Sequence, residues 1–271
     1  MSRWNSFISE KDRPHLIFTM DVEEWYHAEN ISKYVRDASH SSLSRVASVL
    51  DELDKQEAFG TFFVIGELAQ KNSMLIREIV GRGHEIASHG WNHRLIDSMN
   101  SKELLIDLRE SKDVLEQVSG EAVLGYRSPC FSANRNINEM LAEAGYRYSS
   151  CGISASFHDR YGGGFLGKSL EDRTGIPDFP LPSTELFGRY IPSTGGGYFR
   201  LFPLLLQNWL LNRSRQDPLI FYCHPWDFDV SQPLSPEVPF ISRFRHTVGN
   251  SHSLNKLSKL TFSAKPLRDF V

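Results

Sequence analysis

The 271-residue chain has few cysteines, and they lie far apart, at Cys130, Cys151 and Cys223. An odd number of cysteines without close spacing does not make a disulfide framework. Each lies among apolar or small residues, so we expect buried free thiols and a reducing compartment. The chain also lacks a strong excess of charge, because its formal net charge is −3 at pH 7. This excludes a broad basic field, and we expect no nucleic-acid partner.

No apolar run is long enough to cross a membrane. The longest, Leu201 to Leu211, is interrupted by Pro203 and two polar residues, whereas a spanning helix needs about 20 apolar residues. We expect a buried helix there, with contact at a membrane surface as the alternative. Residues 1–14 are polar and charged and lack the apolar centre of a signal peptide. We therefore expect a cytoplasmic protein, with a position at the inner face of the membrane as a second option.

Hydrophobic residues make up 40% of the chain and charged residues 23%, which is ordinary for a soluble protein. The length allows one large α/β barrel or two modest domains. We find no repeat, low-complexity tract or linker, and expect a single domain over residues 1–271. The aromatic content of 12% suits a carbohydrate groove, but it suits a plain core better.

Strand-like apolar runs alternate with segments of helical periodicity. Strands are expected at His15–Met20, Gly60–Ile65, His84–Ser88, Ala122–Tyr126, Tyr146–Ser149 and Leu219–Cys223. Helices are expected at Ser42–Glu57, Glu67–Val80, Ser101–Val118, Asn136–Ala144 and Leu201–Asn212, with a short helix and strand after Leu254. This alternation indicates a parallel sheet with helical crossovers. Residues 158–200 are rich in glycine and proline and predict a structured loop or short β elements over the site.

Polar clusters follow several of these strands, on the face where parallel barrels build active sites. His89 and His93 form an i, i+4 pair that can point two nitrogens at one metal ion. Asp21 and Glu23 end the first strand, and alternate residues of a strand point to the same side. An isolated pair of acids is more often a solvated turn. Beside two imidazoles, however, one carboxylate completes a metal site and the other is free to act as a base, which indicates a mononuclear metal hydrolase.

Two further polar residues follow strands. Arg127 precedes Ser-Pro-Cys-Phe; a lone arginine is usually a surface charge, but one held by a proline turn at this face can clamp a carboxylate. His224 follows a buried strand and precedes Trp226. A histidine there is often a hydrogen-bonded core residue, but its position favours a general acid.

The order of these motifs resembles that of the NodB-like polysaccharide deacetylases, carbohydrate esterase family four. That family has an acidic motif on the first strand, then His-x-x-x-His, an Arg-x-Pro motif and a late strand that ends in histidine. The resemblance covers nearly the whole chain and implies a distorted, incomplete (β/α) barrel. More narrowly, residues 21–23, 158–162, 195–200 and 224–227 resemble the branch found in bacterial exopolysaccharide and O-antigen gene clusters.

Carried over by position, the resemblance implies that Glu23, His89 and His93 hold one divalent metal ion. Imidazole and carboxylate ligands suit Zn²⁺ best, and Co²⁺, Ni²⁺ or Fe²⁺ are also compatible. The resemblance makes Asp21 the catalytic base.

The remaining roles come from the same resemblance. Arg127 would orient the base, and His224 would protonate the leaving amine. The backbone N–H of Cys130 would lie where the family builds its oxyanion hole.

The sequence departs from the family pattern in two places. The family usually has adjacent aspartates, whereas Val22 separates the two acids here. The family also usually has an aspartate near the position of Ser149 that supports the catalytic histidine. Here Asp159 or Asp227 could replace it, or the role could be missing. A less well supported imidazolium would have a lower pKa.

The expected activity is metal-dependent hydrolysis of an N-acetyl group from an amino sugar, with release of acetate. The sugar could be free, nucleotide-linked or lipid-linked. The alternatives are a metal-free sugar-binding protein and another amide hydrolase on the same barrel, such as one for cyclic ureides. Aromatic residues beside the motifs favour a sugar face, namely Trp25, Tyr26, Trp91 and Trp226.

Overall fold

The computed structural model describes residues 16–132, 137–153, 174–214 and 217–271. Its main feature is a six-stranded sheet in the order β5-β4-β3-β2-β1-β8, in which every neighbouring pair is parallel. The strands are β1 (Leu16–Val22), β2 (Thr61–Val64), β3 (Glu85–Ser88), β4 (Gly125–Tyr126), β5 (Tyr148–Ser149) and β8 (Leu219–Cys223). This open, curled sheet with helical crossovers confirms the incomplete (β/α) barrel.

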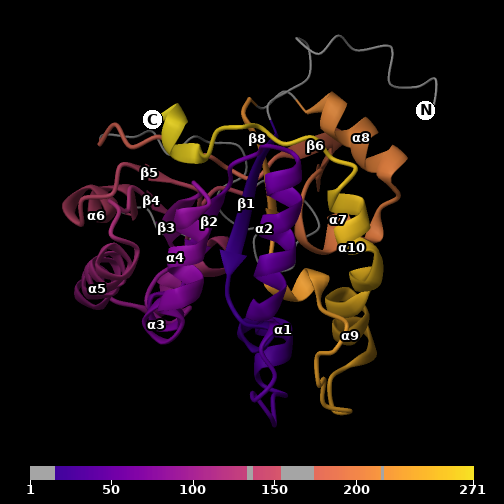
Figure 1. Ribbon diagram of the computed structural model, residues 1–271, viewed down its shortest axis with the longest axis horizontal. Coiled ribbons are helices and arrows are strands. Elements are labelled where there is room, and N and C mark those ends of the chain that lie inside the picture. The colour runs from indigo at the N-terminus through magenta and orange to yellow at the C-terminus, as the bar shows by residue number, and fades with distance from the viewer. Residues whose placement is uncertain (1–15, 133–136, 154–173, 215–216) are drawn as a thin grey trace.

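Helices flank the sheet (Figure 1). They are α1 (Glu29–Ser32), α2 (Arg45–Lys55), α3 (Gly66–Lys71), α4 (Ser73–Gly81), α5 (Ser101–Ser119), α6 (Ile137–Glu143), α7 (Gly196–Leu201), α8 (Leu204–Arg213), α9 (Phe240–Thr247) and α10 (Asn250–Leu257). Helices α5 and α6 lie at the β4–β5 end of the sheet, and α7 and α10 lie at the β8 end (Figure 1).

Strand β1 lies between β2 and β8, and all seven of its residues are buried. Thr19 is in register with Thr61 of β2, and Ile17 with Ile220 of β8. A parallel strand that is covered on both faces needs apolar residues in continuous runs, and the run Leu-Ile-Phe-Thr-Met supplies them. Because neighbouring strands are parallel, the polar residues that follow β1, β3 and β8 meet at one edge.

Helix signals in the sequence explain the longest helix, α5. Asn100 caps its start, and the side chain of Glu103 completes a capping box. The helix ends at Gly120, whose φ of 75° is left-handed, a conformation that glycine adopts without strain.

Several predicted boundaries are wrong. The expected helix Glu67–Val80 is divided into α3 and α4 at Asn72, whose side-chain amide bonds the carbonyl of Leu68 and so competes with the helix ladder. Pro203 separates α7 from α8, because proline cannot continue a helix. The strands β4 and β5 have only two residues each, fewer than the apolar runs suggested.

The last third of the chain is irregular, as expected. The strands β6 (Ser183–Leu186) and β7 (Arg189–Pro192) form an antiparallel hairpin, which confirms short β elements within 158–200, while residues 158–162 lie outside the described residues. Helix α9 was not predicted, and the described chain ends in a 3-10 helix, Leu267–Phe270, instead of a strand.

The prediction of a buried helix at Leu201–Asn212 is wrong in part. Helix α8 buries Gln207, Leu210 and Leu211, but Leu205 is 80% exposed. Within the described residues, no helix combines the length and apolar character that crossing a membrane requires.

Candidate active site

Three predicted metal ligands lie together at the carboxyl ends of β1 and β3. Glu23, His89 and His93 each offer one ligand atom, and these atoms lie within 4.8 Å of one another. The Nε2 atom of His93 is 2.7 Å from Oε2 of Glu23. All three side chains are largely shielded from solvent. A cation bound to them would therefore be partly enclosed by the protein.

The loop that carries the two histidines has an unusual backbone. His93 has a φ of 61°, and Gly90 has a φ of 75°; the left-handed region is costly for a non-glycine residue and is often found at functional sites. A Cβ at Gly90 would lie 3.0 Å from Oδ2 of Asp107. That same oxygen accepts the backbone N–H of Trp91 at 3.1 Å. Asp107 thus fixes the loop from helix α5.

Hydrogen bonding and charge prepare the cluster for a cation. The ring Nδ1 of His89 lies 2.9 Å from the carbonyl oxygen of Arg127, which can only accept, so Nδ1 carries the proton and Nε2 keeps its lone pair. Burial alone would raise the pKa of Glu23, but His93, His224 and His89 lower it to about 2. Burial also lowers the pKa of His89. A carboxylate and a neutral imidazole are the forms that bind metal.

One buried oxygen supports the same reading. Oε2 of Glu23 accepts no hydrogen bond of ordinary geometry from any described residue, although it lies 2.7 Å from His93. A buried carboxylate oxygen without a good donor is costly, and a divalent cation would satisfy it. The donor set therefore fits one divalent metal ion.

The predicted arginine clamp is present. Nη1 of Arg127 lies 2.6 Å from Oδ1 of Asp21, and both side chains are buried. The same nitrogen donates to Thr19 Oγ1, while Nε and Nη2 donate to Ser150 Oγ. The guanidinium also lies 4.0 Å above the ring of Phe63. These contacts fix both the position and the orientation of the Asp21 carboxylate.

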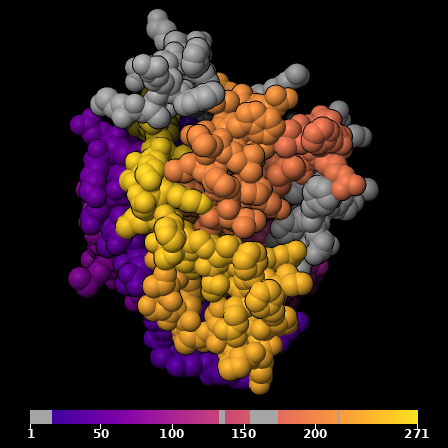
Figure 2. All heavy atoms as spheres, turned by 90° about the vertical axis from the view of Figure 1, so that its right-hand side faces the viewer, coloured from indigo at the N-terminus to yellow at the C-terminus, as the bar shows by residue number. Residues whose placement is uncertain are grey.

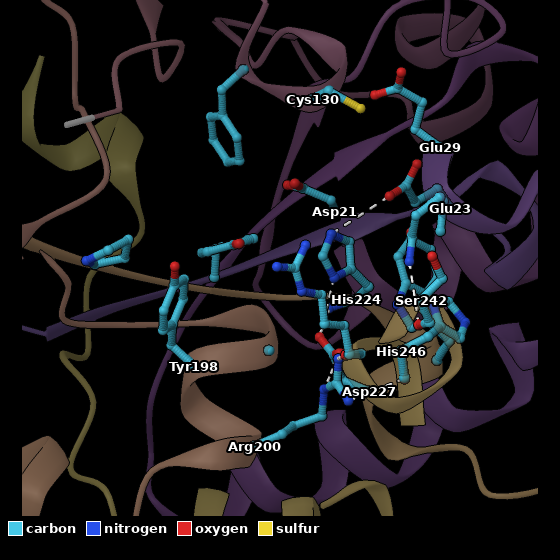
Figure 3. A pocket seen from close by; sticks show the side chains of 18 of the residues that line it. Asp21, Glu23, Glu29, Cys130, Tyr198, Arg200, His224, Asp227, Ser242 and His246 are labelled. Atoms are coloured by element: carbon cyan, nitrogen blue, oxygen red, sulfur yellow. Dashed lines mark hydrogen bonds and ion pairs between the residues drawn. The ribbon is translucent and has the colours of Figure 1, made fainter. Parts of the chain in front are cut away.

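His224 points into the same space as the two acids (Figure 3). Its Nε2 is 3.5 Å from Oε1 of Glu23, and its Nδ1 is 3.1 Å from Oδ2 of Asp227. Its ring stacks on Trp226, with centroids 4.1 Å apart. Between the two candidates for its supporting acid, the structure places Asp227 in this role, whereas Asp159 lies outside the described residues.

Asp227 is itself anchored from α7. Nε of Arg200 lies 2.7 Å from its Oδ1, and both side chains are buried. Burial lowers the pKa of His224, but the charge and hydrogen bond of Asp227 outweigh burial and raise it. The support is therefore present three residues after the histidine, and the lower pKa expected of an unsupported imidazolium does not arise.

Cys130 lies in the Arg-x-Pro turn and lines the cavity. It and Phe131 have φ of 53° and 54°, so the turn after Arg127 is strained. None of the three cysteines is in a disulfide; Cys151 and Cys223 are buried, but Cys130 is partly exposed, which corrects the prediction of a buried thiol there. Its role in an oxyanion hole stays a prediction.

Of the seven predicted site residues, all but Arg127 line a cavity of about 590 Å³. Asp21, Glu23, His89, His93, Cys130 and His224 lie on its wall, and further wall residues from α7 and α9 include Tyr198, Arg200, Phe244 and Arg245. Of the four aromatic residues expected to form a sugar face, only Trp226 lines the cavity. Trp25 is buried in the core, and Trp91 packs against Gly66 of α3.

The sequence did not predict two charged residues that support the site. Arg200 ends the Gly-rich motif 195–200 but was given no role. Asp107 lies between Leu104 and Leu108 on the buried face of α5. An acid on an apolar helix face is a signal that could have identified it.

Two family models match adjoining parts of the chain. Residues 37–149 match "Polysaccharide deacetylase", and residues 151–267 match "Domain of unknown function (DUF3473)". Over residues 37–149 the chain is therefore similar to the polysaccharide deacetylases, the family that the order of its motifs resembles. The second match includes α7, α9 and β8, so it contributes Arg200 and His224 to the cavity. The prediction of a single domain stays a prediction.

Curated relatives are similar over a third of the chain. A peptidoglycan-N-acetylglucosamine deacetylase of Bacillus cereus is 33% identical over 99 residues, which cover 36% of this chain and 46% of the relative. The peptidoglycan-N-acetylmuramic acid deacetylase PdaC of Bacillus subtilis is 28% identical over 93 residues, 34% of this chain and 20% of the relative. The chain thus spans less than half the length of these relatives.

Solved structures share the fold. A Mycobacterium smegmatis protein assigned to the polysaccharide deacetylases has a TM-score of 0.57 at 20% identity, with 97% of this chain and 91% of that chain covered. The Bacillus anthracis protein BA3943, described as a CE4 family pseudoenzyme, has a TM-score of 0.55 at 11% identity, with 95% and 65% covered. A pseudoenzyme among them means that the fold alone does not establish activity.

Proposed function

We propose that this protein is a metal-dependent N-deacetylase that removes an acetyl group from an amino sugar and releases acetate. The observation that carries the proposal is the convergence of two groups of residues on one cavity. A metal-type cluster (Glu23, His89 and His93) lies beside a clamped acid, Asp21, and a supported histidine, His224.

A divalent ion held by Glu23, His89 and His93 would act as a Lewis acid that polarises the acetyl carbonyl. The buried oxygen of Glu23 that lacks a good donor supports this assignment. We propose Zn²⁺ first, because two imidazoles and a carboxylate are typical Zn²⁺ ligands.

Asp21 is the proposed base. It takes a proton from the water that attacks the acetyl carbon, and Arg127, 2.6 Å away, holds its carboxylate toward the cavity. The backbone N–H of Cys130 is proposed to donate to the oxygen on which charge develops.

His224 is the proposed acid. As the C–N bond breaks, it gives a proton to the leaving nitrogen, so that acetate and a free amine result. Asp227 holds the ring through Nδ1 and raises its pKa, which keeps the imidazolium populated near neutral pH.

For the substrate, we propose a bacterial surface polysaccharide or its precursor. The motifs at 21–23, 195–200 and 224–227 support this, because they resemble those of the family branch found in exopolysaccharide and O-antigen gene clusters. The named relatives act on peptidoglycan, a polymer of N-acetylated sugars. A cytoplasmic position, at the inner face of the membrane, is part of the proposal.

Acetate release from a panel of N-acetylated oligosaccharides, nucleotide sugars and lipid-linked sugars tests the proposal. The wild type should release acetate from at least one class, and His224→Ala should be slower by roughly 10²–10⁴-fold. His252→Ala, an exposed histidine of α10, is the matched control and should keep wild-type turnover.

Two results would contradict the proposal. Full activity in His224→Ala would remove the assigned acid. Binding of a sugar without acetate release from any class, in protein supplied with Zn²⁺, would favour a sugar-binding protein on this fold instead.

A further inference from the structure

Acidic and basic residues are unevenly divided along the chain. Residues 186–271 have ten lysines and arginines against five aspartates and glutamates, whereas residues 1–185 have 20 against 28. No acidic residue occurs in 186–216 or 238–268, the segments that contain α7, α8, α9 and α10. The net charge of −3 therefore hides a basic region in these helices.

Large apolar side chains are exposed in the same helices. On α8, Leu205 is 80% exposed and Trp209 is 45% exposed; on α9, Phe240 is 79% exposed and Ile241 is 65% exposed. Single exposed apolar residues are normal, but several on helices that share one side of the molecule indicate a binding surface. Arg213 extends over the ring of Trp209 at 5.0 Å, which places a cation beside an apolar side chain.

The exposed helices share one side of the molecule. Figure 2 shows the orange and yellow segments that contain α7 to α10 on a single face. We name it the α8–α9 face. Leu201, Phe244 and Arg245 belong to it, since each is exposed, and all three also line the cavity. The cavity therefore opens at the edge of this face.

We propose that the α8–α9 face binds the surface of a lipid bilayer that contains anionic headgroups. Surface-bound helices combine large apolar side chains, which enter the interface, with arginines and lysines, which contact phosphates. Helix α9, Phe-Ile-Ser-Arg-Phe-Arg-His-Thr, has this composition and no acid. The bilayer would then lie beside the mouth of the cavity, within reach of a sugar attached to a lipid.

Charge argues against a second copy of the chain as the occupant. In a two-fold symmetric dimer the same patch meets itself. Arg213, Arg243 and Arg245 of the two copies would then face one another, with no acid in 238–268 or 186–216 to compensate. Like charges that meet across an interface cost binding energy, whereas anionic headgroups neutralise them.

The test is co-sedimentation of the full chain with vesicles of phosphatidylcholine alone or with added phosphatidylglycerol. We expect binding to the anionic vesicles, weakened by high salt because surface charges are screened. The variant Leu205→Ser/Trp209→Ser/Phe240→Ser/Ile241→Ser should lose roughly tenfold or more in partitioning. None of these four residues lines the cavity.

The matched control is Met74→Ser/Ile106→Ser, which removes exposed apolar side chains from α4 and α5, at the far side of the molecule (Figure 1). It should bind as the wild type does. Circular dichroism checks that each variant is folded, and vesicle binding is compared only among folded variants. If the four-residue variant misfolds, Phe240→Ser/Ile241→Ser alone serves, with a smaller loss expected.

Three outcomes would overturn the proposal. The first is no binding of the wild type to anionic vesicles at low salt. The second is equal binding by the wild type and the folded α8–α9 variant. The third is a wild-type dimer that the variant abolishes, seen by analytical ultracentrifugation, without vesicle binding. None of these readouts depends on catalytic activity. A failure of the membrane-binding proposal can therefore be distinguished from a failure of the proposed function.

Discussion

At the scale of single residues, three buried carboxylates in one cavity have different neighbours, which suit them to different proposed roles. Glu23 faces three imidazoles, which suits a metal ligand. Asp21 faces a guanidinium, which fixes the orientation of its carboxylate. Asp227 lies between Arg200 and His224, and although burial raises its pKa, these two cations lower it to about 2. It therefore stays ionised and supports the imidazolium.

The first prediction separates Asp21 from Glu23. Asp21→Asn should keep bound Zn²⁺ but lose roughly 10²–10⁴-fold in kcat, because an amide cannot take the proton. Glu23→Gln should instead weaken Zn²⁺ binding. Metal content by elemental analysis and acetate release measure the two effects, with the exposed Asp113→Asn as the control. Swapped phenotypes would show that Glu23 is the base.

The second prediction concerns the support of His224. The acid must be protonated, so kcat falls as pH rises through its pKa. Asp227→Asn removes the charge that raises this pKa, so the alkaline limb should move to lower pH and kcat should fall roughly 10–100-fold. Asp229→Asn is the control, since Asp229 is bonded to His40 and Ser42 and not to His224. An unmoved limb in Asp227→Asn would show that another group delivers the proton.

At the scale of elements, the site is built where strands end and is braced by helices. The turn after β3 presents both histidines, and Asp107 of α5 bonds its backbone. Burial raises the pKa of Asp107 to about 6, against an ordinary value of 3.8. The folded state therefore binds the Asp107 proton more tightly than the unfolded state does. This group favours folding most at low pH, and the benefit is lost as pH rises from about 4 to about 6.

The third prediction follows from the raised pKa of Asp107, which makes its contribution to stability fall as pH rises. Asp107→Asn cannot ionise, so the variant's free energy of unfolding relative to wild type should rise by roughly 2–3 kcal/mol between pH 4 and pH 7, at about 1.4 kcal/mol per pKa unit. Urea unfolding at each pH measures the difference, in which titrations common to both proteins cancel. A difference that does not change with pH would mean that Asp107 is ionised in the folded protein without penalty.

The sequence predicted the elements that carry strong periodicity and the residues that follow them. Val46, Val49, Leu50 and Leu53 repeat at helical spacing, and α2 buries all four. The site residues could be found because each follows an apolar strand. Boundaries failed where a single side chain decides them, as at Asn72. The buried-helix prediction at α8 failed in part because apolar residues occur on all faces of that helix. Composition alone does not say which of these faces is covered by the rest of the protein.

The residues that support the site were harder to predict. Arg200 reaches Asp227 from α7, 27 positions earlier in the chain. Ser150, which follows β5, and Thr19, in the middle of β1, bind the Arg127 guanidinium. Such contacts depend on the three-dimensional arrangement of the strands, and a serine or threonine in or after a strand carries no distinctive pattern.

At the scale of the whole molecule, the two matched segments share one sheet. Strand β8 lies in the DUF3473 match and pairs with β1 over five residues. Phe199 of α7 and Leu257 of α10 are fully buried in the same core cluster as Phe18 of β1. The C-terminal segment thus covers one edge of β1 and supplies part of its core.

The fourth prediction follows from that arrangement. A chain that ends at residue 150 would lose β8 and uncover Phe18 and Met20, which are fully buried in the whole chain. Exposure of a strand edge and its apolar face favours aggregation. We expect the shortened chain to lack a cooperative thermal transition by circular dichroism, while the full chain has one. A cooperative transition in the shortened chain would show two independent domains.

The most direct test of the account is the amount of Zn²⁺ bound per chain, measured by equilibrium dialysis and elemental analysis for the wild type and for His89→Ala. The account predicts about one Zn²⁺ per wild-type chain, and strong loss of Zn²⁺ from a variant that still folds, because one imidazole of a three-residue site is removed. Equal Zn²⁺ in the two proteins, or none in the wild type, would contradict the metal centre on which the proposed chemistry depends.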